Sequence, residues 1–372
     1  MDNNNGRRNF LKKFATVTGG VVLANNTTIG MNEVDQKVII KTQALGFQWQ
    51  TQDPFLFCVH HEDAYPKGNS EMGPQASLEG RNLGQDFMLK DGWRMYHGEK
   101  VPGFPGHPHR GFETITVVRK GMVDHSDSLG AAGRYGDGDV QWMTAGKGLQ
   151  HAEMFPLLDE KKGNPMELFQ IWINLPKADK FVNPHFKMLW SETIPHYMHQ
   201  DSNGKGTEVE VIAGRIEGYK APTPPPNSWA TPTEHEVAVW NINMEPGATW
   251  NLPKATEGVN RSLYFYEGDT LEINSESIEN YHAADLKAHL ETTLKAGNKQ
   301  TKILILQGKP INEPVAQHGP FVMNTRQELQ QAFIDFQQTR FGGWPWDRYD
   351  QVHDRSKGRF ALHANGKLEE RS

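Results

Sequence analysis

Short runs of β-branched and aromatic residues alternate with glycine, proline, aspartate and asparagine from Val38 onward. Strand-like runs separated by turn signals at short intervals are typical of a β-sandwich or a β-barrel. The pattern therefore predicts an all-β chain. Its predicted strands include residues 38–43, 55–60, 114–121, 140–146, 168–175, 208–216, 237–244, 262–268 and 301–308.

One helical pattern stands near the end of the chain. Thr325 and Glu328 have the spacing of a capping box, which satisfies free backbone donors at the start of a helix. Gly342 follows as a stop signal. We therefore predict a helix between them, whose apolar face carries Leu329, Ala332, Phe333 and Phe336.

A weak internal repeat indicates duplication. Residues 111–128 and 258–275 both contain a strand-like run, a glycine turn and a second strand-like run, in the same order. We interpret this as two copies of one β-barrel, joined near residues 176–205. The proline-rich stretch 221–233 interrupts the second copy, and we expect it to form a long, stiff surface loop.

Residues 1–30 differ in composition from the rest of the chain. A basic part with Arg7 and Arg8 precedes a weakly apolar part, residues 14–24, that is too short to span a bilayer. This order predicts a twin-arginine-type signal peptide cleaved after Ala24, hence export to the periplasm and no stable membrane span after cleavage. The alternative is a disordered basic tail on a cytoplasmic protein.

Composition narrows the possible partners and metal ligands. The net charge is -6 with a pI near 6.2, and no basic block follows the first 30 residues, so we expect no nucleic-acid partner. The single cysteine, Cys58, can form neither an intramolecular disulfide nor a zinc-thiolate cluster by itself. Any metal must therefore be held by histidine and carboxylate side chains.

Two pairs of polar residues have the spacing of same-face ligands. His107 and His109 are two positions apart, as are His151 and Glu153, and alternate residues of a strand point to one side. Three imidazoles and one carboxylate suit a first-row divalent metal such as iron, with positions left open for oxygen or substrate. A single pair of histidines at this spacing is usually no more than two solvated side chains. Two ligand pairs, each beside a glycine turn, favour a catalytic metal site.

Glu113 competes with Glu153 for the carboxylate position. It follows His109 by four residues, so on a continuous strand it would face the same side. It could then be a ligand, or it could orient a ligand histidine through a hydrogen bond. The residues alone leave both roles open. His60 and His61, beside two acidic residues, are interpreted as part of a polar loop rather than a surface metal site.

Three long motifs carry a family resemblance. The runs GHPHRGFETIT (106–116), GDVQWMTAGKGLQHAEM (138–154) and PVAQHGPFVMNT (314–325) resemble the pirin family of the cupin superfamily, over about residues 37–340. The resemblance implies two cupin, jelly-roll type, β-barrel domains with a C-terminal helix. The implied divisions are a signal peptide at 1–30, a metal-binding barrel at 36–180, a barrel without a metal at 181–320, and a helix with an aromatic tail at 321–372.

The resemblance also implies the metal site. By carry-over, one divalent metal, iron as Fe²⁺, is held by His107, His109, His151 and Glu153. Glu113 is then not a ligand, and it would instead orient a ligand histidine through a hydrogen bond. The corresponding segment of the second copy contains no histidine, so no metal is expected there.

The implied activity is that of a quercetin 2,3-dioxygenase, which opens a flavonol ring with molecular oxygen. Glu153 would be the catalytic base that accepts the proton of the substrate 3-hydroxyl. The competing implication is an iron-dependent, redox-sensing regulatory protein without enzymatic activity, which the predicted export disfavours. We expect a monomer. Substrate-lining candidates beside the ligands are Phe112, Trp142, Met143 and Phe155.

Three segments depart from the family pattern. Residues 58–69 are longer and more polar than usual, and an insertion at 77–102 lengthens the approach to the metal. We expect both to reshape the entrance of the pocket. The tail at 341–372 extends past the last helix of the family, and we expect it to pack aromatic residues against a barrel.

Overall fold

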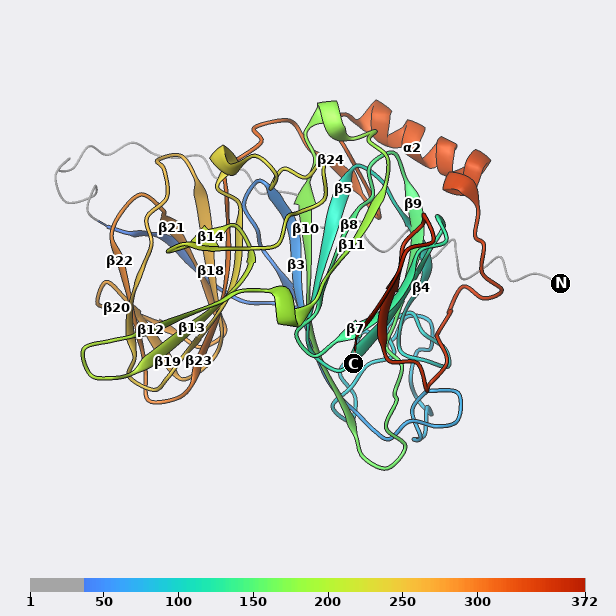
Figure 1. Cartoon of the computed structure of the whole chain (residues 1–372), viewed down its shortest axis with the longest axis horizontal. Coiled ribbons are helices and arrows are strands. Elements are labelled where there is room, and N and C mark those ends of the chain that lie inside the picture. The colour runs from blue at the N-terminus through green and yellow to red at the C-terminus, as the bar shows by residue number, and fades with distance from the viewer. Residues whose placement is uncertain (1–36, 372) are drawn as a thin grey trace.

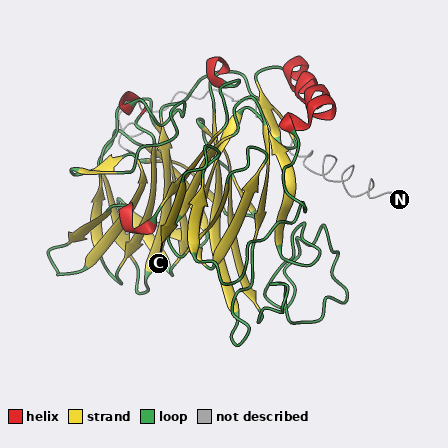
Figure 2. Cartoon of the chain, turned by 45° about the vertical axis from the view of Figure 1, so that its right-hand side comes forward, coloured by secondary structure: helices red, strands yellow, loops and turns green. Residues whose placement is uncertain are grey.

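The computed structural model describes residues 37–371, so the predicted signal peptide lies outside the described residues. Two β-rich barrels lie side by side, with very little helix (Figures 1 and 2). Each run that the sequence predicts as a strand contributes to one, which confirms the all-β prediction. Between residues 37 and 371, no helix is both long and apolar enough to cross a membrane.

The first barrel consists of two six-stranded antiparallel sheets. One has the order β11-β8-β5-β10-β3-β2 and the other the order β27-β26-β7-β6-β9-β4. The strands of the first sheet are β2 (Gln48–Trp49), β3 (Phe55–Tyr65), β5 (Phe112–Lys120), β8 (Val140–Thr144), β10 (Asn164–Asn174) and β11 (His185–Leu189). Those of the second are β4 (Gly103–His109), β6 (Met122–Asp127), β7 (Ala132–Gly136), β9 (Leu149–Met154), β26 (Arg359–Leu362) and β27 (Leu368–Arg371).

The second barrel combines a seven-stranded sheet, β1-β21-β18-β23-β16-β13-β12, with a four-stranded sheet, β17-β22-β19-β20. The larger sheet comprises β1 (Ile39–Ala44), β12 (His196–Gln200), β13 (Gly206–Ala213), β16 (Ala238–Met244), β18 (Asn260–Glu267), β21 (His282–Lys287) and β23 (Thr301–Gly308). The smaller comprises β17 (Thr249–Leu252), β19 (Thr270–Ile273), β20 (Glu276–Glu279) and β22 (Thr292–Ala296).

The two barrels pack sheet against sheet through an apolar interface. Along β5, the odd-numbered Ile115 and Val117 face the second barrel, where they share a buried cluster with Val239 and Leu304. The even-numbered Thr116 faces the interior of the first barrel instead. This alternation makes β5 a wall with one face in the interface and one face in the barrel interior.

The chain exchanges strands between the barrels. β1 pairs with β21 of the second barrel, although it precedes the whole first barrel in the sequence. β26 pairs with β7, so the tail adds two strands to the first barrel. The predicted divisions at 36–180, 181–320 and 321–372 did not foresee these exchanges, and the boundaries themselves stay predictions.

The predicted helix is α2 (Arg326–Thr339), which lies over one end of the first barrel (Figure 1). Its capping box is confirmed, because Thr325 accepts from the backbone N–H of Glu328 and Glu328 accepts from that of Thr325. Arg340, in the left-handed conformation, ends the helix before Gly342. Within residues 37–371, the remaining short elements are β14 (Arg215–Ile216), β15 (Tyr219–Lys220), β24 (Ala316–His318), β25 (Phe321–Met323) and four 3-10 turns at 177–179, 191–193, 233–235 and 340–342.

Candidate metal centre

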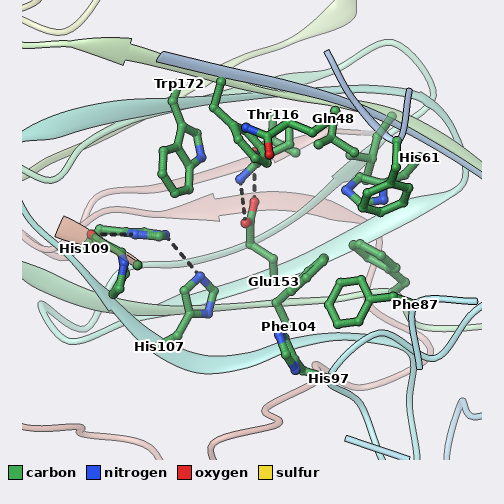
Figure 3. A pocket seen from close by; sticks show the side chains of 18 of the residues that line it. Gln48, His61, Phe87, His97, Phe104, His107, His109, Thr116, Glu153 and Trp172 are labelled. Atoms are coloured by element: carbon green, nitrogen blue, oxygen red, sulfur yellow. Dashed lines mark hydrogen bonds between the residues drawn. The ribbon is translucent and has the colours of Figure 1, made fainter. Parts of the chain in front are cut away.

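The pairing of β4 with β9 brings three histidines together inside the first barrel. His107 lies directly opposite His151 in the antiparallel ladder, and His109 is on the same face two residues further along. One ring nitrogen from each lies within 4.8 Å of the others. All three side chains are buried. Figure 3 shows His107 and His109 at one side of a cavity.

The backbone fixes which nitrogen of two of these rings faces the cluster. The Nδ1 atoms of His107 and His109 lie 3.0 and 3.4 Å from the carbonyl oxygens of Pro105 and Pro320. A carbonyl only accepts, so each Nδ1 carries the hydrogen and each Nε2 presents a lone pair. The two Nε2 atoms are 3.1 Å apart. Two lone pairs at this distance repel each other unless a cation lies between them.

Burial keeps the three imidazoles neutral, as metal ligands must be. It lowers the pKa of His107 to about 4, and it lowers the pKa values of His109 and His151 well below the usual value. The neighbouring histidines lower them further. Both ring nitrogens of His151 are buried and lack a hydrogen-bond partner among the described residues. A divalent cation would satisfy these lone pairs, so the residues present fit such an ion.

Glu153 lies beside the histidines but is held by other partners. Its Oε2 is 3.8 Å from Nε2 of His151 and accepts a hydrogen bond from Nε2 of Gln170 at 3.0 Å. Its Oε1 accepts from the hydroxyl of Thr116 at 2.8 Å. Burial raises the pKa of Glu153, against these hydrogen bonds, which lower it. Its predicted role as fourth ligand stays a prediction.

The prediction that Glu113 supports a ligand histidine is wrong. Its carboxylate accepts hydrogen bonds from Thr144 and from Ser228 of the proline-rich stretch, on the interface side of β5. Gly111, with φ +86, forms a turn between β4 and β5, so the strand alternation does not continue from His109 to Glu113. Ser228 is itself buried, so the proline-rich stretch is not only a surface loop.

A cavity of about 480 Å³ opens beside the three histidines, between the two sheets of the first barrel (Figure 3). Small-molecule sites commonly measure about 300–1,000 Å³. Of the four predicted lining residues, Phe155 lines it, whereas Phe112, Trp142 and Met143 are buried in the surrounding core. Eight of the nineteen residues that line it are aromatic or aliphatic: Phe47, Phe57, Val59, Phe87, Phe104, Phe155, Leu168 and Trp172.

Two of the three segments that depart from the family pattern, residues 58–69 and the insertion 77–102, form the far wall of this cavity. The insertion contributes Gln85, Phe87 and His97. The interpretation of His60 and His61 as a polar loop is wrong, because both belong to β3 and point to opposite faces. His61 lines the cavity, and the ring of His60 stacks on Phe169.

Thr116 and Gln170, which hold Glu153, were not predicted from the sequence. A signal was present for Gln170, which interrupts the apolar run 168–173 of β10. Thr116 does not stand out in the same way, because β5 also carries Glu113 and Thr114. A buried polar side chain needs a partner, so such residues mark an interior hydrogen-bond network. Each belongs to the same face as the cavity.

Comparison with known proteins places the chain in a family. Residues 39–173 match the family model described as Pirin, and residues 239–342 match the Pirin C-terminal cupin domain. Human pirin is 36% identical over 263 residues, which cover 69% of this chain and 82% of the human protein. Pirin-1 of Arabidopsis thaliana is 37% identical over 248 residues, covering 64% and 78% of the two chains.

A solved structure with a similar fold agrees with this family assignment. The crystal structure of quercetin 2,3-dioxygenase from Acinetobacter baumannii superimposes with a TM-score of 0.65 at 28% identity, covering 83% of this chain and 99% of that chain. The family matches include both barrels, and the similar fold extends over most of the chain. This protein therefore belongs to the pirin family and is built from two cupin domains.

Proposed function

We propose that this protein is a metal-dependent dioxygenase that opens the ring of a quercetin-type flavonol with molecular oxygen. The observation that carries the proposal is the position of three neutral histidines and a carboxylate at one side of an aromatic-walled cavity of about 480 Å³. The similarity to a quercetin 2,3-dioxygenase structure supports the choice of substrate class.

In this proposal His107, His109, His151 and Glu153 hold one mononuclear divalent metal, and we propose iron. When bound, such a metal supplies a Lewis-acid site at which a flavonol 3-hydroxyl loses its proton more easily and oxygen can react nearby. Every residue of this set is buried, so the metal would be reached only through the cavity.

Glu153 accepts the proton of the substrate 3-hydroxyl. Thr116 and Gln170 hold its carboxylate at the cavity, and a pKa raised by burial makes the carboxylate a better proton acceptor than an exposed glutamate. The flat rings of the flavonol lie against aromatic side chains such as Phe104 and Trp172. Both oxygen atoms of O₂ enter the opened ring system, and one ring carbon leaves as carbon monoxide.

The cavity also favours an enzyme over a regulatory protein that only binds iron. A protein that acts through its surface needs no substrate space beside its metal. Here the space beside the histidines is large enough for a small aromatic molecule and is lined for one. We therefore favour the enzyme.

The test is to purify the chain without residues 1–24, load it with Fe²⁺ under anaerobic conditions, and then admit air with quercetin. We expect quercetin consumption together with release of carbon monoxide. A Glu153→Gln variant that keeps its iron should consume quercetin at least about a hundredfold more slowly, as expected for loss of a general base. Iron-loaded wild-type protein that turns over no flavonol would refute the proposal.

A further inference from the structure

A chain of hydrogen bonds ends at the cavity wall away from the candidate ligands. In Figure 3, His61 lies on the other side of Glu153 from His107 and His109. Its Nδ1 is 2.9 Å from the hydroxyl of Tyr96. That hydroxyl is 2.5 Å from Oδ2 of Asp63.

The same chain continues to a positive charge. Oδ1 of Asp63 accepts a hydrogen bond from Nη1 of Arg94 at 3.1 Å. His61, Asp63 and Tyr96 are all buried, with exposed fractions of 4%, 2% and 0%. Both carboxylate oxygens of Asp63 are thus occupied, one by Arg94 and one by Tyr96. A buried carboxylate with these partners is well suited to accept, rather than donate, the phenol hydrogen bond.

These contacts determine the tautomer of His61. The Tyr96 hydroxyl has one hydrogen, which it donates to Asp63, so its oxygen must accept from Nδ1 of His61. Nε2 of His61 then carries a lone pair. Burial, with His60 and Arg94 nearby, lowers the pKa of His61 to about 3, so the ring is neutral. Within residues 37–371, the only hydrogen bond of the His61 ring is at Nδ1, so no protein group uses the lone pair of Nε2.

The backbone is also arranged to present Tyr96. Its φ of +56 lies in the left-handed region, which is unfavourable for an aromatic residue. Two backbone hydrogen bonds with Asp86, of 2.9 and 2.7 Å, hold it there. Asp86 also accepts hydrogen bonds from Arg81 and from the backbone N–H of Met95. The insertion is therefore a structured platform for Tyr96.

Two phenylalanine rings pack against the ring of His61, although Gln48, Gln85 and His97 also line the cavity. The rings of Phe47 and Phe104 are each centred 5.9 Å from that of His61. Phe87 contacts Phe47, with ring centres 6.3 Å apart, and lines the same wall. A buried acceptor beside aromatic rings favours a ligand that brings a hydrogen-bond donor to that point, because an unmatched polar group is costly to bury.

We propose that Nε2 of His61 accepts a hydrogen bond from a phenolic hydroxyl at the end of the substrate remote from the metal. This inference rests on the proposed function. Under it, the preferred substrate is a flavonol that carries a further hydroxyl group away from its 3-position. Tyr96 and Asp63 are positioning residues, since they set the tautomer of His61 without touching the substrate.

The test compares two flavonols that share the 3-hydroxyl. Quercetin has further ring hydroxyls, whereas 3-hydroxyflavone has none. Their dissociation constants are measured without oxygen on the metal-loaded protein. We expect the wild type to bind quercetin about tenfold more tightly than 3-hydroxyflavone. In His61→Phe the two constants should agree within about twofold, because only quercetin loses affinity.

His60→Phe is the matched control, as it changes the same residue type in the same strand on the face away from the cavity. It should keep the quercetin preference. Tyr96→Phe should reduce the preference too, and nitrogen NMR of labelled histidine should show His61 losing its Nδ1-protonated form. Bound metal and melting temperature are measured for each variant to confirm folding.

The outcomes separate the two proposals. If folded, metal-loaded His61→Phe keeps the wild-type preference for quercetin, the role of His61 is refuted while the dioxygenase proposal stands. If the wild type binds neither flavonol, the flavonol proposal fails and the inference for His61 fails with it. Equal binding of the two flavonols by the wild type would refute the role of His61 alone.

Discussion

At the scale of single residues, the free-energy cost of burying three histidines in the candidate metal centre is offset when a cation binds them. His107, His109 and His151 lose hydration on folding, and two of them direct Nε2 lone pairs at each other across 3.1 Å. Such an arrangement is unfavourable in the free protein. A bound cation removes the repulsion and therefore stabilises the folded state, since the unfolded chain does not preserve the site.

Removing two ligands should abolish metal binding. We expect the double variant His107→Ala, His151→Ala to retain less than about a tenth of the wild-type metal content, because one imidazole and one carboxylate leave too few ligands. Elemental analysis after dialysis measures this. The melting temperature of the wild type should fall on treatment with a chelator, whereas that of the variant should not change.

His199→Ala is the matched control, since His199 lies on β12 in the second barrel. It should keep both the metal and the response to chelator. A double variant that still bound stoichiometric metal would show that the three-histidine cluster is not the metal site.

The same residues show how far the sequence could predict the site. The spacing of His107 with His109, and of His151 with Glu153, was informative because each pair lies within one uninterrupted strand. The spacing from His109 to Glu113 misled because the turn at Gly111 intervenes. Successive side chains alternate between the two faces only within one continuous strand. An even spacing therefore does not predict the same face when a glycine in the left-handed region lies between the two residues.

At the scale of elements, α2 links the second half of the chain to the candidate site. Arg110, the residue after His109, donates a hydrogen bond of 2.6 Å to Asp335 of α2 and another of 2.7 Å to the carbonyl of Lys147. Pro320, just before β25, contacts Nδ1 of His109 and lines the cavity. The ordering of α2 and of the adjoining hairpin thus supports the position of a candidate ligand.

The capping box of α2 gives a stability prediction. Thr325→Ala removes the side-chain acceptor for the backbone N–H of Glu328 and should lower the free energy of unfolding by about 1 kcal/mol. Thr325→Ser keeps a hydroxyl and should lose much less. Urea unfolding of the three proteins measures both effects. Equal losses for the alanine and serine variants would contradict a capping role.

The wall formed by the insertion could not be predicted at this scale. Residues 77–102 have neither helical nor strand periodicity, and they form isolated bridges such as Asp86 with Tyr96 instead of regular strands. The direction of the Tyr96 side chain depends on its partners Asp63 and His61, which belong to β3. The local pattern of apolar and polar residues carries no information about a contact between distant segments. The same pattern was sufficient to predict the long apolar strands and α2.

At the scale of the whole molecule, the two barrels are joined by an apolar cluster that their facing sheets share. Polar contacts cross the same interface. Ser228 donates to Glu113, and Arg119 forms an ion pair with Glu210. Burial raises the pKa of Glu113 to about 7, above its ordinary value of 4.5. The interface therefore contains a carboxyl group that favours its protonated form.

This raised pKa predicts a pH dependence of stability. Between about pH 4.5 and pH 7, the folded protein keeps a proton on Glu113 that the unfolded chain releases, so the free energy of unfolding falls as pH rises through this window. Glu113→Gln keeps an uncharged side chain. Relative to the wild type, it should gain on the order of 3 kcal/mol between pH 4.5 and pH 8.

Urea unfolding at the two pH values measures this gain. Glu79→Gln, at an exposed position, is the control and should show no such gain. A difference between wild type and Glu113→Gln that does not change with pH would contradict the assignment of a protonated Glu113.

We propose that residues 1–30 direct export of the protein to the periplasm. In a bacterium with a twin-arginine pathway, the full chain should accumulate in the periplasm and lose its first 24 residues. The double variant Arg7→Lys, Arg8→Lys should stay in the cytoplasm, because that pathway reads the arginine pair. Fractionation with mass spectrometry of the mature N-terminus measures both. Equal periplasmic yields from the two proteins would refute the twin-arginine route.

The return of the C-terminal strands β26 and β27 to the first barrel limits the order in which the protein can be assembled. β26 and β27 complete a sheet whose other strands were synthesised roughly 200 residues or more earlier, since Phe360 of β26 pairs with Arg134 of β7. During synthesis, the metal-binding barrel therefore keeps an open edge at β7 until nearly the whole chain has emerged. An unpaired edge invites pairing with other chains. A chain cut after α2 should consequently aggregate, even though every candidate metal ligand is present.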